Sequence, residues 1–511
     1  MRTPKGVAAV AAAVCSLAGV AAGKEMKVNM KLKAELYDSG IRHEQIMALK
    51  NRIWNELDAQ GVYDSTQYKP FPEGSPMISM MTGNHDTVTE PQPSTDFIAC
   101  KDGMASYVPG DPKYTFKCSN LDLYDFKTHS QLGSASGRGA GSWGWYNHRS
   151  GREFVAIAQE DGTSFSEVSK QGKLIYLGRL PQYPTALPSL WREIKGYKHY
   201  VVIGSEAVDH GVQIFDLEKL ETVDPASPVV FSNDKDLAGF WTEGLPIGRS
   251  HNVVTNEERD YGVAVGFAPR NATLRAGLVF FDLKDPKNPK TLGGTGQDGY
   301  VHDAQCIVYR GPDRKYDGRD ICYGYDEDSL TIFDVTDKKN IKILSNTSYE
   351  GASYTHQGWV LDPMWQQYLI VDDEYDEVDA VGPAADGYPI SYIWDISSLE
   401  SPKQTGHYKG LRKGIDHNQF VKDGFSYQSN YALGISILDL RSVPKDPTGK
   451  GIKEVAYFDT HPEDDNVPGG GNITFTGSWS HYPFLPSGYI VINTMDRGAF
   501  VVKANKDLKK V

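Results

Sequence analysis

A short apolar segment that ends in an acidic residue recurs along the chain from about residue 98. Examples are GVQIFDL around Asp216, LVFFDL around Asp282 and LTIFDV around Asp334. The other copies end at Asp125, Glu167, Asp395 and Asp439, and an acid-free copy lies near Val501. The copies are separated by roughly 45 to 65 residues, a period that is typical of four-stranded propeller blades. The pattern therefore predicts an all-β chain folded as a β-propeller.

The number of blades follows from the first strand of each unit. These strands begin near Trp145, Trp191, His251, His302, His356, His417 and His481. We therefore expect seven blades, with six or eight as alternatives, and an unrelated β-sandwich array as the competing fold. The last unit stops after its third strand, and SNLDLYDFK, before the first unit, could supply the missing outer strand. Such a closure would remove an exposed sheet edge.

The chain before the repeats differs in character. Residues 1–23 combine Arg2 and Lys5 with an apolar run and small residues, which is the pattern of a secretory signal peptide. Residues 24–97 are expected to form a leader that packs on the propeller of residues 98–511. Within it, the apolar spacing from Ala34 to Ala59 favours a helix. The C-terminal VVKANKDLKKV lacks the hydrophobic tail that a GPI anchor needs, and we expect no transmembrane span.

Composition indicates a globular protein rich in strands, and the acidic charge fits a secreted protein, although many cytosolic proteins share it. The 51 Gly, 28 Pro and 29 Tyr fit many strands and turns. The formal net charge of −13 argues against nucleic acid as a partner. Once Cys15 has left with the signal peptide, four cysteines remain, and we expect two local bridges, Cys100–Cys118 and Cys306–Cys322, with free buried thiols as the alternative. Three sequons predict glycosylation at Asn271, Asn346 and Asn472.

Several long motifs carry a resemblance to a known family. They include YVHDAQCIVYRGPD from Tyr300, YTHQGW from Tyr354, IDHNQF from Ile415 and GSWSHYPFLPSGYIVI from Gly477. Over roughly residues 98 to 503 the chain resembles the choice-of-anchor B family, which is built from LVIVD-type propeller repeats. The resemblance implies a secreted or surface-attached propeller and says little about activity. The chain departs from the family pattern in lacking a C-terminal anchor and a cysteine before GLVFFDL.

Histidines open five successive units, and in a propeller the starts of the first strands lie near one mouth of the central channel. We expect these residues to form a ring there: His251, His302, Asp303, His356, Asp416, His417 and His481. Converging imidazoles and carboxylates suit a divalent metal ion such as Zn, Cu or Mn, with His302, His356 and His417 as the first candidate ligands. Partly protonated histidines could instead bind an anion. A purely structural role is the main alternative, because each blade must hydrogen-bond to its neighbours.

Other candidate groups are weaker. Glu206 and His210 stand at a strand end, where they either join the channel mouth or lie in a solvated loop. Trp191 and Arg192 are candidates for an anion site in the channel. Asp372, Asp373 and Glu374 belong to the acidic run DDEYDE, whose oxygen atoms could hold Ca²⁺, although the run lacks EF-hand spacing.

Two classes of function remain open. The first is a secreted, monomeric binding scaffold that recognises an extracellular protein or glycan through the face of the propeller. The second is a metal-dependent hydrolase or oxidoreductase that uses the histidine ring. The chain shows no nucleophile elbow and no phosphate-binding loop, so the scaffold is the preferred interpretation. Propellers host both classes, and the fold alone does not decide between them.

Overall fold

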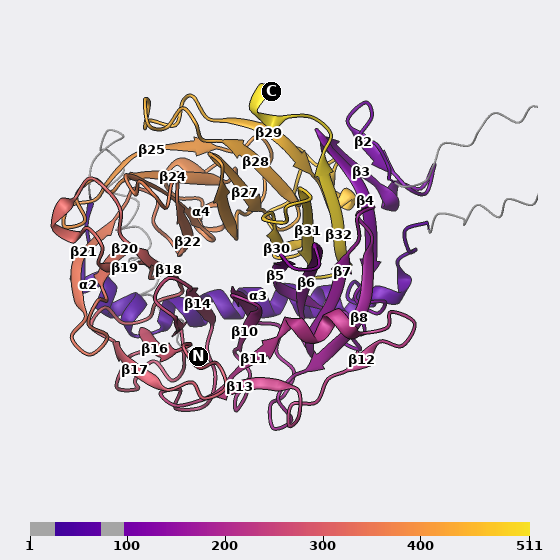
Figure 1. Cartoon of the computed structure of the whole chain (residues 1–511). Helices are drawn as coiled ribbons and strands as arrows, with labels where there is room; N and C mark the ends of the chain where they lie inside the picture. Colours follow the sequence, from indigo (N-terminus) through magenta and orange to yellow (C-terminus); the bar gives the residue numbers. More distant parts are fainter. Residues whose placement is uncertain (1–25, 73–96) are drawn as a thin grey trace, which may run out of the picture.

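The computed structural model describes residues 26–72 and 97–511 of the chain. Within these residues the strands form seven sheets, each with a core of four antiparallel strands, and the sheets are arranged as the blades of a ring (Figure 1). The first strands of neighbouring blades contact one another, for example β5 with β9 and β9 with β14, so they form the inner wall of the ring. The predicted seven-bladed β-propeller is confirmed.

Each of the first six blades is a consecutive stretch of chain whose first strand lies at the inner edge and whose last strand lies at the outer edge. Blade 1 holds β5 (Gly139–Asn147), β6 (Arg152–Gln159), β7 (Gly162–Val168) and β8 (Leu174–Pro181); blade 2 holds β9 (Arg192–Tyr197), β10 (Tyr200–Ser205), β11 (Val212–Asp216) and β13 (Leu237–Trp241). Blade 3 holds β14 (Asn252–Asn256), β15 (Tyr261–Val265), β16 (Leu278–Asp282) and β17 (Thr291–Thr295); blade 4 holds β18 (Asp303–Val308), β19 (Asp320–Tyr325), β20 (Leu330–Asp334) and β21 (Lys342–Ser348). Blade 5 holds β22 (Thr355–Val360), β23 (Tyr368–Asp373), β24 (Ile390–Asp395) and β25 (Lys403–Lys409); blade 6 holds β26 (Gln419–Lys422), β27 (Phe425–Ser429), β28 (Ile435–Asp439) and β29 (Lys453–Phe458).

The ring is closed by a strand from the other end of the chain. Blade 7 takes β30 (Ser478–Tyr482), β31 (Tyr489–Thr494) and β32 (Gly498–Ala504) from the C-terminal end, and β4 (Leu121–Thr128) pairs antiparallel with β32 as its outer strand. The closure predicted from SNLDLYDFK is therefore present. It joins segments from the two ends of the propeller in one sheet and leaves no open blade edge at the seam.

The middle strands of the blades are apolar because both of their faces are covered. Val202 and Ile214 of blade 2 pack against Val279 and Phe281 of blade 3, and all four side chains are buried. A strand covered on both faces is a continuous apolar run rather than an alternating one. This is why the repeats in the sequence appear as short blocks such as VQIFD.

Short strands cover several outer edges. β1 (Met26–Lys27) pairs with β21 of blade 4, and β12 (Val229–Val230) pairs with β8 of blade 1. β3 (Thr115–Ser119) pairs with β29 of blade 6, and β2 (Met104–Ser106) pairs with β3. The leader thus contributes β1 to blade 4, while β2, β3 and β4, which precede blade 1 in the chain, join blades 6 and 7.

The leader crosses the ring as a helix. The chain passes from β1 through α2 (Met30–Leu32) and the π-helical turn η1 (Lys33–Asp38) into α3 (Ile41–Ala59), which runs across the ring (Figure 1). The helix predicted near the N-terminus is present, but its α-helical part begins at Ile41 because Gly40 adopts a left-handed φ of 82° just before it. Ile46, Lys50 and Trp54 are buried on α3 and lie four residues apart, which places them on one face of the helix.

The remaining helical segments are short. They are η2 (Ser65–Gln67), η3 (Pro112–Tyr114), η4 (Leu217–Thr222), η5 (Arg314–Tyr316), α4 (Asp376–Asp379), η6 (Gly382–Ala384), η7 (Pro462–Asp464) and η8 (Leu508–Lys510). In the described part of the chain, no helix has both the length and the apolar character needed to cross a membrane. The predicted signal peptide lies outside the described residues.

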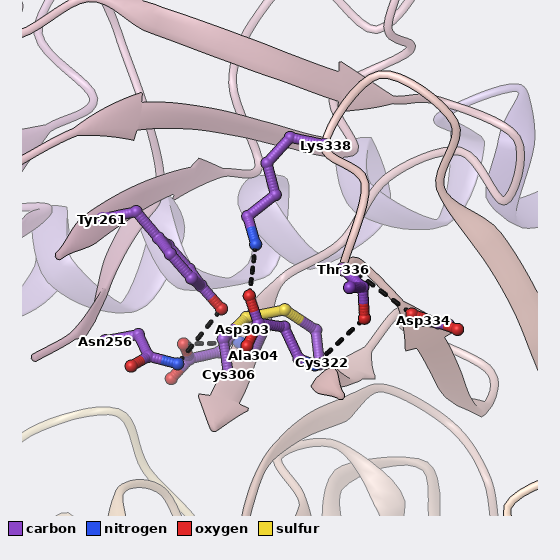
Figure 2. Close-up of a disulfide and its surroundings, with 10 residues drawn as sticks. Asn256, Tyr261, Asp303, Ala304, Cys306, Cys322, Asp334, Thr336 and Lys338 are labelled. Carbon is purple, nitrogen blue, oxygen red and sulfur yellow. Dashed lines mark hydrogen bonds and ion pairs between the residues drawn. A yellow bond between two sulfur atoms is a disulfide. The ribbon is translucent and has the colours of Figure 1, made fainter. Parts of the chain in front are cut away.

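Both predicted disulfides are present. Cys306 and Cys322 lie directly opposite each other on β18 and β19, with a Cα–Cα distance of 4.0 Å (Figure 2). Cys100 and Cys118 have a Cα–Cα distance of 5.9 Å and tie the segment at residue 100 to β3. Both bridges are local, as the spacing of the cysteines predicted.

Candidate functional site

Four of the five predicted histidines lie side by side at the inner starts of blades 3 to 6. The ring centroids of His251 and His302 are 4.1 Å apart, and those of His302 and His356 are 4.3 Å apart. His356 and His417 follow at 4.3 Å. The repeat places each ring at the same point of successive blades, so the four imidazoles form a continuous arc, which we call the histidine arc.

His481 does not belong to the arc, and the structure corrects its expected position. An irregularity in β30 between Ser478 and Ser480 places Trp479 beside His417, with ring centroids 4.9 Å apart. His481 lies two residues further along the strand, where its Nδ1 is 2.8 Å from the Ser429 hydroxyl. An alignment of the blades by their histidines does not find Trp479.

A signal for Trp479 exists in the sequence. Thr355 in blade 5 and Ser478 in blade 7 both form an isolated bridge to the blade before them. Aligning these two hydroxyl residues sets Trp479, and not His481, opposite His356. In blades 5 and 7 the bridging hydroxyl residue is therefore a better marker than the histidine, whereas in blades 4 and 6 Val301 and Asp416 stand before the ring.

The arc histidines are anchored through Nδ1. The Nδ1 atom of His302 donates to the His356 carbonyl oxygen at 2.9 Å, and that of His417 donates to the Trp479 carbonyl oxygen at 2.7 Å. In His356 the Nδ1 atom is 3.1 Å from Asp372 Oδ1. Because a carbonyl oxygen only accepts, the proton of His302 and of His417 must sit on Nδ1 and the lone pair on Nε2. His356 has the same tautomer when Asp372 is the acceptor.

Burial keeps these imidazoles neutral. It lowers the pKa of His302 and His356 well below the ordinary value, and it lowers the pKa of His417 to about 4 even though Glu374 opposes the effect. Within the described residues, no hydrogen bond uses the Nε2 atoms of these three rings. Three unprotonated ring nitrogens therefore remain available for a ligand.

A buried carboxylate stands next to the arc. Donor atoms of His356, His417 and Glu374 all lie within 4.8 Å of one another, and Glu374 Oε1 is 3.8 Å from His417 Nε2. Tyr431 donates its hydroxyl proton to the same Oε1 atom. Burial would raise the pKa of Glu374, but the Lys50 ammonium and the hydrogen bond from Tyr431 outweigh it and hold the pKa below the usual range.

The leader helix covers this group. The Lys50 ammonium on α3 donates to both Glu374 oxygens, at 2.7 and 2.8 Å. Trp54, one turn further along α3, donates its indole proton to the Phe475 carbonyl oxygen at 2.8 Å and packs edge-on against Trp191 at 5.0 Å. The sequence does not predict Lys50 and Trp54 as site residues, because nothing local in the leader shows which part of the propeller it will meet.

The weaker candidates divide between the arc and the protein interior. Glu206 joins the arc, since its Oε1 atom is 2.5 Å from His251 Nδ1 and its other oxygen pairs with Arg249.

Arg192 does not face the channel: its Nε atom donates to the Gln159 carbonyl oxygen at 3.0 Å and its Nη1 contacts His210. Arg192 and His210 are fully buried, which contradicts the expected anion site for Arg192 and the channel or solvated loop for His210.

The predicted calcium candidates do not converge. Asp372 accepts from the Gln357 backbone at 2.9 Å and from the Gln419 side chain at 2.7 Å. Asp373 accepts from the Tyr349 hydroxyl and from backbone amides, while Glu374 meets Lys50. Asp372 and Asp373 are successive residues of β23 and point in opposite directions, and both oxygens of Glu374 are taken by Lys50, so the three carboxylates do not converge on one point.

The two ring aspartates also turn away from the imidazoles. Asp303 accepts from the Gln357 side chain at 3.0 Å. Asp416 lies against Asp376 and Glu377. The arc is therefore made of imidazoles with Glu374 and Glu206, and the two ring aspartates are not part of it.

The three sequons differ in accessibility. Asn271 and Asn472 are exposed. The Asn346 amide nitrogen, which is the atom that a glycan would use, donates to Asp298 at 2.6 Å and to Thr331 at 2.8 Å. The folded protein therefore presents Asn271 and Asn472 to solvent but not the Asn346 amide.

No protein-family model and no curated protein sequence matches the chain. Among solved structures it is similar to the RRP9 WD40 repeats, with a TM-score of 0.43 and 8% identity over 71% of this chain and 93% of that chain. It is also similar to the β-propeller domain of Myceliophteria thermophila Cps50 (Swd1), with a TM-score of 0.42 and 10% identity over 71% and 96% of the two chains. The designed protein Ika8 has a TM-score of 0.42 and 10% identity over 80% and 95%. These values support no inference about function, and the fold assignment rests on the strand pairing.

Proposed function

We propose that this protein is a secreted β-propeller of the choice-of-anchor B type that binds one transition metal ion, Zn²⁺ or Cu²⁺, at the histidine arc. The ligands are Nε2 of His356, Nε2 of His417 and a carboxylate oxygen of Glu374. The observation that carries the proposal is the anchoring of the imidazoles through Nδ1, which leaves neutral Nε2 atoms beside a buried carboxylate. The two disulfides are compatible with an extracellular location.

The hydrogen bonds resemble the surroundings of known metal-binding histidines. A ligating histidine usually donates its second ring N–H to a carbonyl or a carboxylate, which fixes the ring and its tautomer. His417 does so with a carbonyl oxygen and His356 with Asp372. If the histidines only linked neighbouring blades, the hydrogen bonds of Nδ1 would be explained, but Nε2 would have no partner. This difference favours metal binding over the purely structural alternative.

Lys50 would compete with the metal for the same carboxylate. Its ammonium group donates to both oxygens of Glu374, and a positive charge at this point opposes a second cation. Binding of the metal therefore requires Lys50 to move away from Glu374 or to lose its proton. The leader helix thus acts as a cover whose displacement opens the site.

The propeller surface provides the second part of the proposed function. An extracellular protein or glycan is the expected partner, recognised by a face of the monomeric ring. The arc residues stand at the starts of the inner strands, so a partner that displaces α3 from them would also uncover Glu374. The scaffold and the metal site would then be coupled through the leader.

The test is elemental analysis of secreted, tag-free protein that has met neither chelator nor nickel resin. About one Zn or Cu per chain is expected, with its loss in His417→Ala. His481→Ala, a buried histidine outside the arc, and His148→Ala, an exposed one, should keep the metal. Metal-free wild type that also shows no heat of binding when titrated with Zn²⁺ or Cu²⁺ would refute the proposal.

A further inference from the structure

Three other carboxylates meet at the junction of blades 5 and 6. Asp376 and Glu377 lie on α4, in the loop between β23 and β24, and Asp416 lies in the connection that leads into β26. One oxygen atom of each residue lies within 4.8 Å of those of the other two. Residues from two blades thus form one compact acidic cluster, which we call the junction cluster.

The carboxylates of the junction cluster are buried and poorly satisfied. Asp376, Asp416 and Glu377 are 0%, 1% and 2% exposed. Both oxygens of Asp416 and both oxygens of Glu377 accept no hydrogen bond from the described residues. Asp376 uses one oxygen to accept from the Tyr392 hydroxyl at 2.7 Å, while its other oxygen is unsatisfied. Buried polar atoms normally have partners, so these five oxygens point to a missing ligand.

Two other buried acidic groups of this protein, at Asp328 and at Glu374, carry their own cation. Lys33 of the leader lies 3.1 Å from Asp328 and 3.6 Å from Asp298. Lys50 pairs with Glu374. No ion pair among the described residues reaches a carboxylate of the junction cluster. Lysine thus balances the buried negative charge at Asp328 and at Glu374, whereas the junction cluster has no such partner.

We propose that the junction cluster is a binding site for one hard divalent cation, Ca²⁺ in the first place. Its donors are carboxylate oxygens only, which suit Ca²⁺ and do not meet the nitrogen and sulfur preference of Zn²⁺ or Cu²⁺. Three carboxylates packed together repel one another in a medium of low dielectric, and a divalent ion removes both this repulsion and the desolvation cost. Water molecules complete the six to eight oxygen ligands that Ca²⁺ takes.

This cation site is distinct from the histidine arc but shares chain with it. Asp416 is followed directly by His417, and Asp376 lies two residues after Glu374. A cation bound at the junction cluster would fix α4 and the start of blade 6, and so hold two of the arc residues in place. The two sites nevertheless use different donor atoms, so each can be tested while the other is left intact.

The experiment uses the full secreted chain after dialysis against EGTA. Ca²⁺ is titrated by calorimetry, and the Tm is measured with and without about 1 mM Ca²⁺. We expect about one Ca²⁺ per chain and a rise in Tm of roughly 2 °C or more. The double variant Glu377→Gln, Asp416→Asn should lose both effects, and Asp386→Asn, an exposed aspartate paired with Lys409, should keep them.

A second measurement, the Tm of the double variant in EGTA, distinguishes a folded protein that lacks the site from a protein that fails to fold. In EGTA the double variant should melt at a higher temperature than the wild type, because two mutually repelling groups have become neutral. His417→Ala should keep the Ca²⁺ response, which separates this proposal from the metal at the arc. A wild type whose Tm and calorimetric heat do not respond to Ca²⁺ would overturn the proposal and leave a cluster neutralised by shared protons.

Discussion

Lys50 and Glu374 form an ion pair in which both side chains are withdrawn from solvent, with 6% and 0% of their surface exposed. The residues are 324 positions apart in the sequence, so the pair joins the leader helix to blade 5. A buried pair is costly to break, because removal of one partner leaves an uncompensated charge. The same geometry makes Lys50 the competitor of any metal at Glu374.

Replacement of Lys50 by Met should therefore have two opposite effects. Without metal, the variant should be less stable than the wild type by about 3 to 5 kcal/mol, since Glu374 stays buried without its partner. With metal, its affinity for Zn²⁺ or Cu²⁺ should rise at least about tenfold, which corresponds to about 1.4 kcal/mol of removed competition. Calorimetric titration and thermal melts with and without metal measure both effects.

Lys31→Met is the matched control for this variant, because Lys31 lies on the same leader but its side chain is 83% exposed. It should change neither stability nor metal affinity. An affinity of Lys50→Met equal to that of the wild type would show that the ammonium does not compete with the metal, and it would place the metal away from Glu374.

The ring closure gives a prediction about stability. Phe126 on β4 is paired with Phe500 on β32, their rings are 4.5 Å apart, and Phe126 is 1% exposed. Phe126→Ala should lower the free energy of unfolding by about 3 to 5 kcal/mol, as is typical for a large side chain removed from a core. Phe97→Ala, at an exposed aromatic residue close to the same blade, should cost far less.

Denaturant titration of both variants measures the difference. Equal small losses in the two variants would mean that β4 is not held in blade 7 in solution. The urea slope should remain that of the wild type in either case, because the surface exposed by unfolding is unchanged.

The blades can be predicted from the sequence because the strands of most blades follow one another directly along the chain. The repeat of apolar strands, the outer strand around Asp125 and the cysteine pairs are all visible over short distances along the chain. The histidine arc follows from the same repetition. The prediction for His481 was wrong because it rests on residue type, whereas the irregularity in β30 decides which side chain reaches the mouth.

Contacts between distant segments could not be predicted in the same way. The acidic run DDEYDE contains oxygen ligands, as its composition indicates, but its first three members are divided among separate partners. Asp416, forty residues downstream of Asp376, becomes its neighbour only when blades 5 and 6 pack together. Lys50 likewise meets Glu374 only because α3 crosses the ring.

Glycan occupancy should follow the accessibility of each sequon. Asn271 and Asn472 are exposed and should carry glycans when the chain is secreted from a eukaryotic host. Asn346 should remain unmodified, since a glycan there would remove the hydrogen bonds to Asp298 and Thr331. Peptide mapping by mass spectrometry gives the occupancy of each site. A glycan on Asn346 of the folded, secreted protein would contradict the orientation of β21.

His129 should make the stability depend on pH. It lies just after the closing strand, where Nε2 donates to the Thr494 carbonyl oxygen at 2.7 Å and Nδ1 faces the Gln159 amide. Burial lowers the pKa of His129 from 6.5 to about 4 in the folded state. Between these two values the unfolded chain binds more protons, so the stability from this residue is complete above about pH 6.5 and is lost as the pH falls toward 4.

The expected loss from this one residue approaches about 1.4 kcal/mol per pH unit in the middle of that window. His129→Gln keeps a donor for Thr494 but does not titrate, so its unfolding free energy should fall less steeply than that of the wild type between about pH 6 and pH 4.5. His148→Gln, at an exposed position, should follow the wild-type slope. Parallel curves for His129→Gln and the wild type would show that His129 is already protonated in the folded protein, and that the closing strand tolerates a charge at its end.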